Sequence, residues 1–157
     1  MRKNNKLLSI LEKKGIDAVI ISDPYNLRYY SGFSGEEAYY YVSASRQMLV
    51  TDSRYTLWAC SECGKDNVYT ASDGGKGILK EYLAEDDVQC LGLEGGHLTH
   101  DKYDELVAYF NINAIVSVSD ILAELRMIKT NEEIDKIAAA EAIGDNAFEH
   151  ICNVLKS

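Results

Sequence analysis

The sequence predicts an α/β fold, in which helices flank a mixed sheet of about six strands. Short apolar or β-rich runs recur along the chain, and segments with helical spacing separate most of them. Two of these runs, residues 39–42 and 47–51, are joined only by residues 43–46, which is the length of a hairpin connection. One hairpin among helical crossovers indicates a mixed sheet rather than a purely parallel one.

Each expected strand is a short run that stops at turn-forming residues. Residues 17–22 form a continuous apolar run, which suits a strand that is buried on both faces. The later runs are similar in length and are rich in β-branched or aromatic residues. The expected strands span residues 17–22, 39–42, 47–51, 67–71, 88–93 and 113–118.

Helix boundaries follow from capping residues and from glycines. Residues 4–5 are both Asn, and one of them is expected to cap the first helix, while Asn26 is expected to cap a short second helix. Asp52 or Ser53 is the expected cap of the third helix, and Thr99 caps a later one. The expected helices span residues 6–14, 27–30, 78–83, 101–110 and 121–127, with a further helix ending near residue 63.

The last segment differs from the rest. Residues 130–133 form a capping box that opens a helix with an apolar stripe, and no further element follows to cover that stripe. We therefore expect residues 1–125 to form one domain and residues 126–157 to be a linker and the first helix of a second domain. We also predict a homodimer in which a second copy covers the stripe, with Phe148 and Ile151 among the buried contacts. The stripe comprises Ile134, Ile137, Phe148, Ile151 and Leu155.

The composition argues against several classes of partner. The 157 residues include 16 Lys and Arg against 25 Asp and Glu, which gives a net charge of −9. Nucleic acids and anionic membranes are bound by clustered Lys and Arg, and the sequence has no such cluster. No apolar run approaches the roughly 18 residues of a membrane span, and no signal-peptide core follows the basic start. We predict a cytoplasmic protein with reduced cysteines, no nucleic-acid partner and no membrane contact.

Three carboxylates suggest a metal site, with a simpler alternative. Asp23, Asp52 and Glu94 each follow an expected strand, and carboxylates at strand ends can converge on a magnesium ion, as a nuclease needs. The alternative is that Asp23 starts a turn, Asp52 caps a helix and Glu94 precedes one. The lack of a basic groove favours this alternative.

The cysteines and histidines form a second candidate site. Cys60 and Cys63 have the spacing of a redox pair or of half a zinc site, but they fall late in an expected helix rather than at its start. His97 and His100 are expected at a solvated helix start, and His150 on the surface. We therefore predict no metal-binding residues in this chain.

Three consecutive tyrosines occupy one expected strand. Tyr39, Tyr40 and Tyr41 must point to both faces, so at least one face presents a large aromatic surface. We interpret that surface as a self-association or interdomain surface, with ordinary strand packing as the alternative.

Four stretches, in this order, resemble the amino-terminal domain of the creatinase, prolidase and Xaa-Pro aminopeptidase family. They are NLRYYSGFSG (26–35), LVTDSRY (49–55), LGLEG (91–95) and LRMIKTNEEI (125–134). The resemblance covers nearly the whole chain, although Ser53 stands where the family usually has Gly. It implies a ribonuclease-H-like mixed sheet, in agreement with the order of elements above.

The resemblance also implies a function. In this family, two divalent ions (Mn, Co or Zn) bind to two Asp, one His and two Glu of a separate "pita-bread" domain, where they activate the water that cleaves the peptide. Such ligands would lie beyond this chain, so we expect no catalytic residue and no cofactor within it. The resemblance implies the non-catalytic amino-terminal domain of a proline-specific metallopeptidase, most like an Xaa-Pro aminopeptidase.

Such a domain would serve oligomerisation and the shaping of a cleft for short proline-containing peptides, with its own catalytic domain as a partner. Alternatives are a stand-alone binding or assembly module of the same fold, or an Xaa-Pro dipeptidase (prolidase). The resemblance makes Phe33, in its glycine-flanked loop, and Arg54 the candidate residues of the substrate cleft. Arg54 suits a peptide carboxylate, and its alternative role is to hold Asp52.

Overall fold

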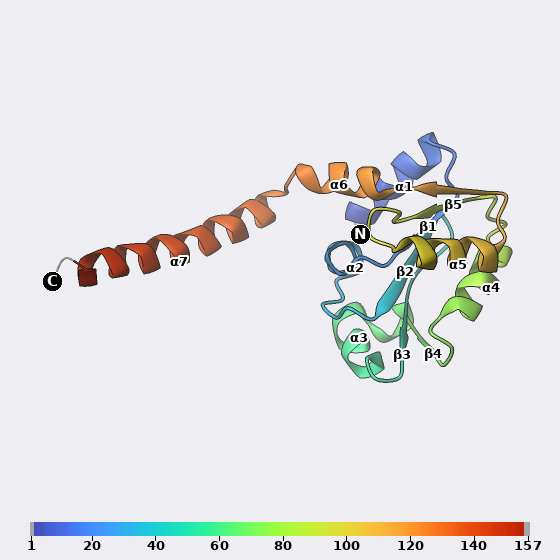
Figure 1. Cartoon of the computed structure of the whole chain (residues 1–157), viewed down its shortest axis with the longest axis horizontal. Helices are drawn as coiled ribbons and strands as arrows, with labels where there is room; N and C mark the ends of the chain where they lie inside the picture. The colour runs from blue at the N-terminus through green and yellow to red at the C-terminus, as the bar shows by residue number, and fades with distance from the viewer. Residues whose placement is uncertain (1, 156–157) are drawn as a thin grey trace. The chain divides into compact units, whose positions relative to one another are not determined.

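The computed structural model describes residues 2–155 (Figure 1). The chain divides into two compact units, Met1–Leu125 and Arg126–Ser157. The first unit contains the whole sheet and the helices that pack on it, and the second contains one long helix.

The first unit is built on six strands, which form one sheet. They are β1 (Ala18–Ile21), β2 (Ala38–Ser43), β3 (Gln47–Asp52), β4 (Val68–Ala71), β5 (Cys90–Leu93) and β6 (Ala114–Ser117). Their order across the sheet is β4-β3-β2-β1-β5-β6. β2 is antiparallel to β1 and β3, and the other neighbouring pairs are parallel. The predicted mixed sheet and its hairpin are confirmed.

Seven α-helices and one short 3₁₀ turn connect or follow these strands in the described residues. They are α1 (Arg2–Lys13), α2 (Pro24–Ser31), α3 (Thr56–Cys63), the turn η1 (Lys65–Asn67), α4 (Lys76–Glu85), α5 (His100–Phe110), α6 (Ser119–Met127) and α7 (Asn131–Leu155). Every predicted helix is present, although several begin earlier than predicted.

A separate hydrophobic core lies on each face of the sheet. On β1, Val19 and Ile21 pack into the core covered by α1, α2, α3 and α6, whereas Ala18 and Ile20 face the core covered by α4 and α5. All four residues are buried, which explains why the sequence of β1 is continuously apolar. At about 25 cal/mol per Å² of apolar surface removed from water, this two-sided burial is the main force that holds the sheet together.

The three tyrosines of β2 take part in this two-sided packing. Tyr40 is buried in the first core and Tyr41 in the second, while Tyr39 is half-buried beside the second. The strand-packing alternative therefore describes Tyr40 and Tyr41, which offer no exposed surface for self-association.

Two predicted caps are wrong. Asn4 lies inside α1 and is buried, with Nδ2 donating hydrogen bonds to the Tyr40 hydroxyl (2.8 Å) and to Gln47 Oε1 (2.7 Å). Asn26 lies inside α2, whose cap is Asp23, because Asp23 Oδ1 accepts from the backbone N–H of Asn26 over 3.0 Å. Pro24 at the first position of α2 suits an earlier start, since its missing N–H is not needed there.

The predicted cap of α3 is also wrong. The helix starts at Thr56, and its first turn has no side-chain cap. Asp52 instead accepts a hydrogen bond from the backbone N–H of Arg54 in the turn before the helix (2.8 Å). The prediction at Thr99 is confirmed, because its hydroxyl accepts from the backbone N–H of Lys102.

The second unit begins with the predicted capping box. Glu133 Oε2 accepts from the N–H of Thr130 (2.8 Å), and Thr130 Oγ1 accepts from the N–H of Glu133 (3.3 Å). No described residue of α7 is buried. Its large apolar side chains, from Ile134 to Leu155, are each more than half exposed. None of the helices in the described part of the chain is long and apolar enough to cross a membrane.

Candidate functional site

The carboxyl ends of β1, β3 and β5 meet at one edge of the sheet, where Glu94 joins two of them. Glu94 follows β5 and is only 1% exposed. Its Oε2 accepts from the backbone N–H groups of Ser22 and Asp23, the latter over 2.7 Å, and its Oε1 accepts from Asn26 Nδ2 over 2.6 Å. The Ser22 hydroxyl lies 3.3 Å from Oε2. Glu94 does precede a helix, α5, but its side chain is occupied by distant partners, residues 22, 23 and 26, around the start of α2.

Asp23 and Glu94 do come together at this edge, but Asp52 does not join them. Asp23 Oδ1 caps α2. The other carboxylate oxygen, Asp23 Oδ2, lies 3.3 Å from His97 Nδ1. Asp52 is instead occupied by Arg54. Among residues 2–155, no group of three or more His, Cys, Asp or Glu is arranged to hold a metal ion. The residues that the structure describes therefore do not fit a dinuclear metal centre.

Arg54 forms a two-pronged contact with Asp52. Nη2 lies 2.6 Å from Asp52 Oδ2, and Nε donates to both carboxylate oxygens at 3.1 and 3.2 Å. The Arg54 side chain hydrogen bond is the main reason that the pKa of Asp52 lies below its usual value. The arginine side chain is 68% exposed. Arg54 therefore holds Asp52, as its alternative role required, and still presents its guanidinium to solvent.

Phe33 lies underneath its loop rather than on it. The ring is fully buried and packs edge-on against Tyr55 (6.4 Å between centroids) and Trp58 (5.6 Å). The next residue, Ser34, is held by Glu62 on α3, whose carboxylate accepts from the Ser34 N–H (2.8 Å) and hydroxyl (2.6 Å). A Cβ at Gly35 would collide with the Phe33 ring, so glycine is required there. Phe33 thus supports the loop from the core.

A cavity of about 360 Å³ lies over the same sheet edge, and we call it the edge pocket. Its lining combines acids from the start of β2 and the end of β3 with bases from α4, α5 and the loop before α5. Of these lining residues, only Asp52, His97 and Tyr39 were singled out from the sequence. The other lining residues could have been found from their positions in the sequence, because several of them lie next to the ends of expected strands. Ligands commonly bind at the strand ends of an α/β sheet. The lining is formed by Ser22, Glu36, Glu37, Ala38, Tyr39, Val50, Thr51, Asp52, Gly74, Lys76, His97, Leu98 and Lys102.

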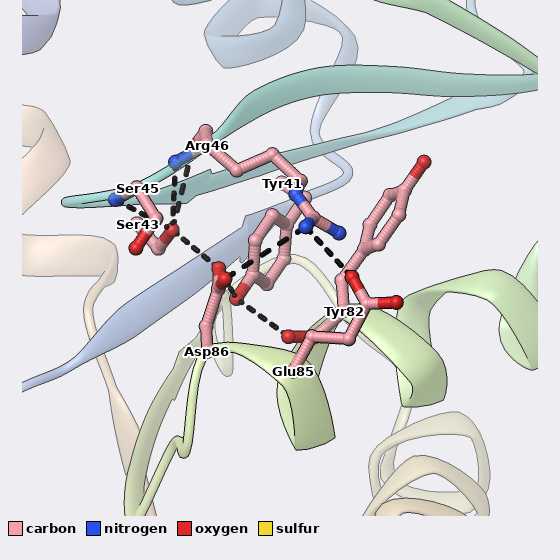
Figure 2. A network of polar contacts seen from close by, with 7 residues as sticks. All are labelled: Tyr41, Ser43, Ser45, Arg46, Tyr82, Glu85 and Asp86. Carbon is pink, nitrogen blue, oxygen red and sulfur yellow. Dashed lines mark hydrogen bonds and ion pairs between the residues drawn. The ribbon is translucent and has the colours of Figure 1, made fainter.

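A second polar network lies at the other end of β2 (Figure 2). Asp86 Oδ2 accepts from the hydroxyls of Tyr41 (2.8 Å) and Ser43 (2.6 Å), and Arg46 Nη2 lies 4.0 Å from Oδ1. Arg46 also lies over the Tyr82 ring, 4.1 Å from its centroid. Burial, followed by the hydrogen bond to Asp86, raises the pKa of Tyr41. The network fastens the β2–β3 hairpin to the end of α4 and was not found from the sequence.

The remaining candidate residues are not among those that form the edge pocket or the Asp86 network. Cys60 and Cys63 are free thiols in the second half of α3, and burial is the main cause that raises the pKa of Cys63. His100 begins α5 and lies 3.5 Å from Asp104, and His150 is exposed on α7. A raised thiol pKa is the opposite of what a reactive cysteine needs.

Comparison with known proteins places this arrangement in a family. A model of the Creatinase/Prolidase N-terminal domain family matches residues 3–128. The chain is 29% identical over 154 residues to the uncharacterized peptidase YqhT of Bacillus subtilis. The aligned region covers 98% of this chain and 44% of YqhT. The structure matches the Xaa-Pro dipeptidase from Bacillus anthracis with a TM-score of 0.88 and 28% identity, over 98% of this chain and 43% of that one. It also matches the N-terminal domain of the cytoplasmic peptidase PepQ from Mycobacterium tuberculosis (TM-score 0.71, 32% identity), over 79% of this chain and 98% of that one.

The chain spans less than half the length of YqhT and of the Bacillus anthracis enzyme. The family match covers all but the last part of the chain and includes the first three stretches on which the resemblance was based, together with the start of the fourth. The mixed sheet, its strand order and the family match agree with one another. This chain belongs to the Creatinase/Prolidase N-terminal domain family.

Proposed function

We propose that this chain is the non-catalytic amino-terminal part of a proline-specific metallopeptidase, most like an Xaa-Pro aminopeptidase. The observation that carries the proposal is the match to the Bacillus anthracis Xaa-Pro dipeptidase, which extends over 98% of this chain but only 43% of that enzyme. Because that relative is named an Xaa-Pro dipeptidase, the second candidate function for the full-length protein is that of an Xaa-Pro dipeptidase. On either proposal, the metal ions and the hydrolytic residues belong to another part of the full-length enzyme.

The chain would help to wall the cleft that receives short peptides with proline in second position. Arg54 is the residue proposed to reach the substrate, because its guanidinium is exposed and is already fixed in direction by Asp52. A planar guanidinium can hold a peptide carboxylate through two parallel hydrogen bonds. Phe33 would act indirectly, by supporting the loop of residues 32–35 from below.

The chain is further proposed to act in a homodimer in the cytoplasm, with its own catalytic domain as a second partner. The apolar stripe on α7 supports a partner of some kind, since leaving large apolar side chains in water forfeits roughly 1.5 to 3 kcal/mol for each one. The cytoplasmic proposal is supported by the name of the PepQ relative, a cytoplasmic peptidase.

A hybrid enzyme tests the function. This chain replaces the matching residues of the Bacillus anthracis dipeptidase, and cleavage of Ala-Pro is measured with added manganese. We expect the hybrid to cleave Ala-Pro, and the purified chain alone to cleave none with manganese, cobalt or zinc. Hydrolysis by the chain alone that tracks with it through purification, or a folded hybrid without activity, would contradict the proposal.

Variants of the hybrid test the cleft. Arg54→Ala should lower kcat/KM by about tenfold, because one charge-assisted contact to the substrate is lost. Lys65→Ala is the matched control, since it removes the same charge from an exposed position on η1 and should leave kcat/KM unchanged. Circular dichroism and gel filtration establish that each hybrid is folded. Equal kcat/KM for the two variants would remove Arg54 from the cleft.

A further inference from the structure

The edge pocket lies where an α/β sheet is best placed to bind a small molecule. Ser22 follows β1, Asp52 ends β3, and His97 lies in the loop after β5, so three parallel strands point their carboxyl ends at it. The helix that follows β1 covers one face of the sheet, and the helix that follows the neighbouring β5 covers the other. Strands whose connections leave on opposite faces open a crevice at their carboxyl ends.

One side of the edge pocket is cationic. Lys76 and Lys102 both line it, and both ammonium groups pair with the single carboxylate of Glu105, the second over 3.0 Å. Asp73 also interacts electrostatically with Lys76, so the two ammonium groups lie near two carboxylates. The amino end of α4 is already occupied by Asp73, whose carboxylate accepts from the backbone N–H groups of Gly75 (2.9 Å) and Gly77 (3.0 Å).

Two glutamates add acidic groups to the same lining. Glu36 and Glu37 line the pocket just before β2, and no hydrogen bond or ion pair joins either carboxylate to a side chain that the structure describes. Asp52 adds a third carboxylate, which is already paired with Arg54. Arg54 also interacts electrostatically with Glu37. Both Glu36 and Glu37 are exposed, so a positively charged group of a ligand can reach them.

The lining also has an apolar part. Ala38, Tyr39, Val50 and Leu98 contribute to it, and Val50 is buried beneath it in the second core. A ligand that bridges the two sides would bury an apolar side chain on these residues. The cavity of about 360 Å³ is at the small end of the roughly 300 to 1,000 Å³ that is usual for ligand sites.

We propose that the edge pocket binds a free apolar α-amino acid as its zwitterion. The ammonium group lies between Glu36 and Glu37, the carboxylate faces Lys76 and Lys102, and the side chain rests on Tyr39 and Val50. A molecule with one charge would satisfy only one side, and a ligand without an apolar side chain would leave the middle of the pocket wet. The proposal concerns binding by this chain and goes beyond the peptidase function, so either can fail without the other.

Titration of the ¹⁵N-labelled 157-residue chain with L-leucine and L-proline tests it, with amide NMR shifts as the readout. At least one of the two is expected to shift the amides of residues 36–39, 50–52, 74–77 and 97–102. L-leucinamide, which lacks the carboxylate, and N-acetyl-L-leucine, which lacks the ammonium group, should each bind at least about tenfold more weakly than L-leucine. Glycine should also bind more weakly, because it has no side chain.

Variants separate the two sides of the pocket. The double variant Glu36→Gln, Glu37→Gln and the single variant Lys102→Met should each weaken amino-acid binding by about tenfold or more. Glu81→Gln, an exposed acid on α4 outside the pocket, is the control and should bind like the unmodified chain. The proposal is overturned if neither amino acid shifts these amides, if the shifts map elsewhere, or if the single-charge analogues bind equally well.

Discussion

Asn26 on α2 donates a hydrogen bond of 2.6 Å to the buried Glu94 carboxylate at the end of β5, a partner 68 residues further along the chain. This contact, with the backbone hydrogen bonds from Ser22 and Asp23 to the same carboxylate, fastens the start of α2 to the edge of the sheet. The edge pocket begins at Ser22, so the same carboxylate holds one of its walls in place.

Replacing Glu94 should cost more stability than any exposed acid. In Glu94→Gln, the amide nitrogen faces N–H donors that the carboxylate accepted, so we expect the free energy of unfolding to fall by about 3 kcal/mol. Urea unfolding followed by circular dichroism measures it. Glu12→Gln, at an exposed position on α1, should change it by less than about 0.5 kcal/mol. Equal losses in the two variants would contradict the assignment.

The hydrogen bond between Tyr41 and Asp86 should appear as an energetic coupling. A double-mutant cycle of Tyr41→Phe and Asp86→Ala is expected to give a coupling of about 1 kcal/mol, because both groups lie in a largely buried network. Tyr41→Phe combined with Glu85→Gln is the comparison, since Glu85 binds Arg46 and not Tyr41. Its coupling should be near zero, and a coupling as large as that with Asp86 would be inconsistent with the network in Figure 2.

Stability should fall in alkaline solution. Burial, partly offset by the hydrogen bond from Asn4, raises the pKa of Tyr40 to about 12 from its ordinary value of 10.0. Between these two values the folded state holds a proton that the unfolded state has lost, so the free energy of unfolding decreases as the pH rises. Urea midpoints measured from about pH 9 to about pH 11 check this. Tyr40→Phe should make the decline shallower, and an unchanged slope would show that Tyr40 is not responsible.

Substitutions at Phe33 and Arg54 should lower the free energy of unfolding by very different amounts. Phe33→Ala leaves a cavity in the core beside Trp58 and should cost about 3 to 5 kcal/mol. Arg54→Ala removes only an exposed ion pair, which solvent screens, and should leave the free energy of unfolding nearly unchanged. Trp58 is the sole tryptophan, so its fluorescence reports unfolding next to both residues. A small loss at Phe33 would mean that the ring is not held in the core.

The apolar stripe on α7 should drive self-association. Light scattering is expected to give a dimer for the intact chain and a monomer for a chain that ends at Thr130. Phe148→Glu should also give a monomer, because it places a charge in the proposed contact. His150→Ser, about 200° around the helix from Phe148, is the control and should stay dimeric. A monomeric intact chain, or a dimer that survives the truncation, would show that the stripe is not the interface.

Local patterns in the sequence were enough to predict the elements and their order. The continuous apolar run of β1, the spacing of the β2–β3 hairpin and the capping boxes or caps at Thr99 and Thr130 each depend on residues within a few positions of one another. At Asn4 the predicted cap failed because distant partners intervened. Asn4 was a plausible cap by type, but it is buried because Tyr40 and Gln47 reach it from the hairpin.

Only the tertiary structure decided what Glu94, Asp86 and the lining of the edge pocket do. Glu94 contacts residues some 70 positions away, because β5 lies beside β1 in the sheet. Asp86 meets Tyr41 because α4 covers the face of β2 from which that ring projects. Hydrophobic periodicity and capping residues report only on residues that are close in the sequence. The order of the strands in the sheet determines which side chains from distant parts of the sequence come into contact. A buried polar group takes whichever partner that space supplies, since leaving it unpaired costs more than any local preference provides.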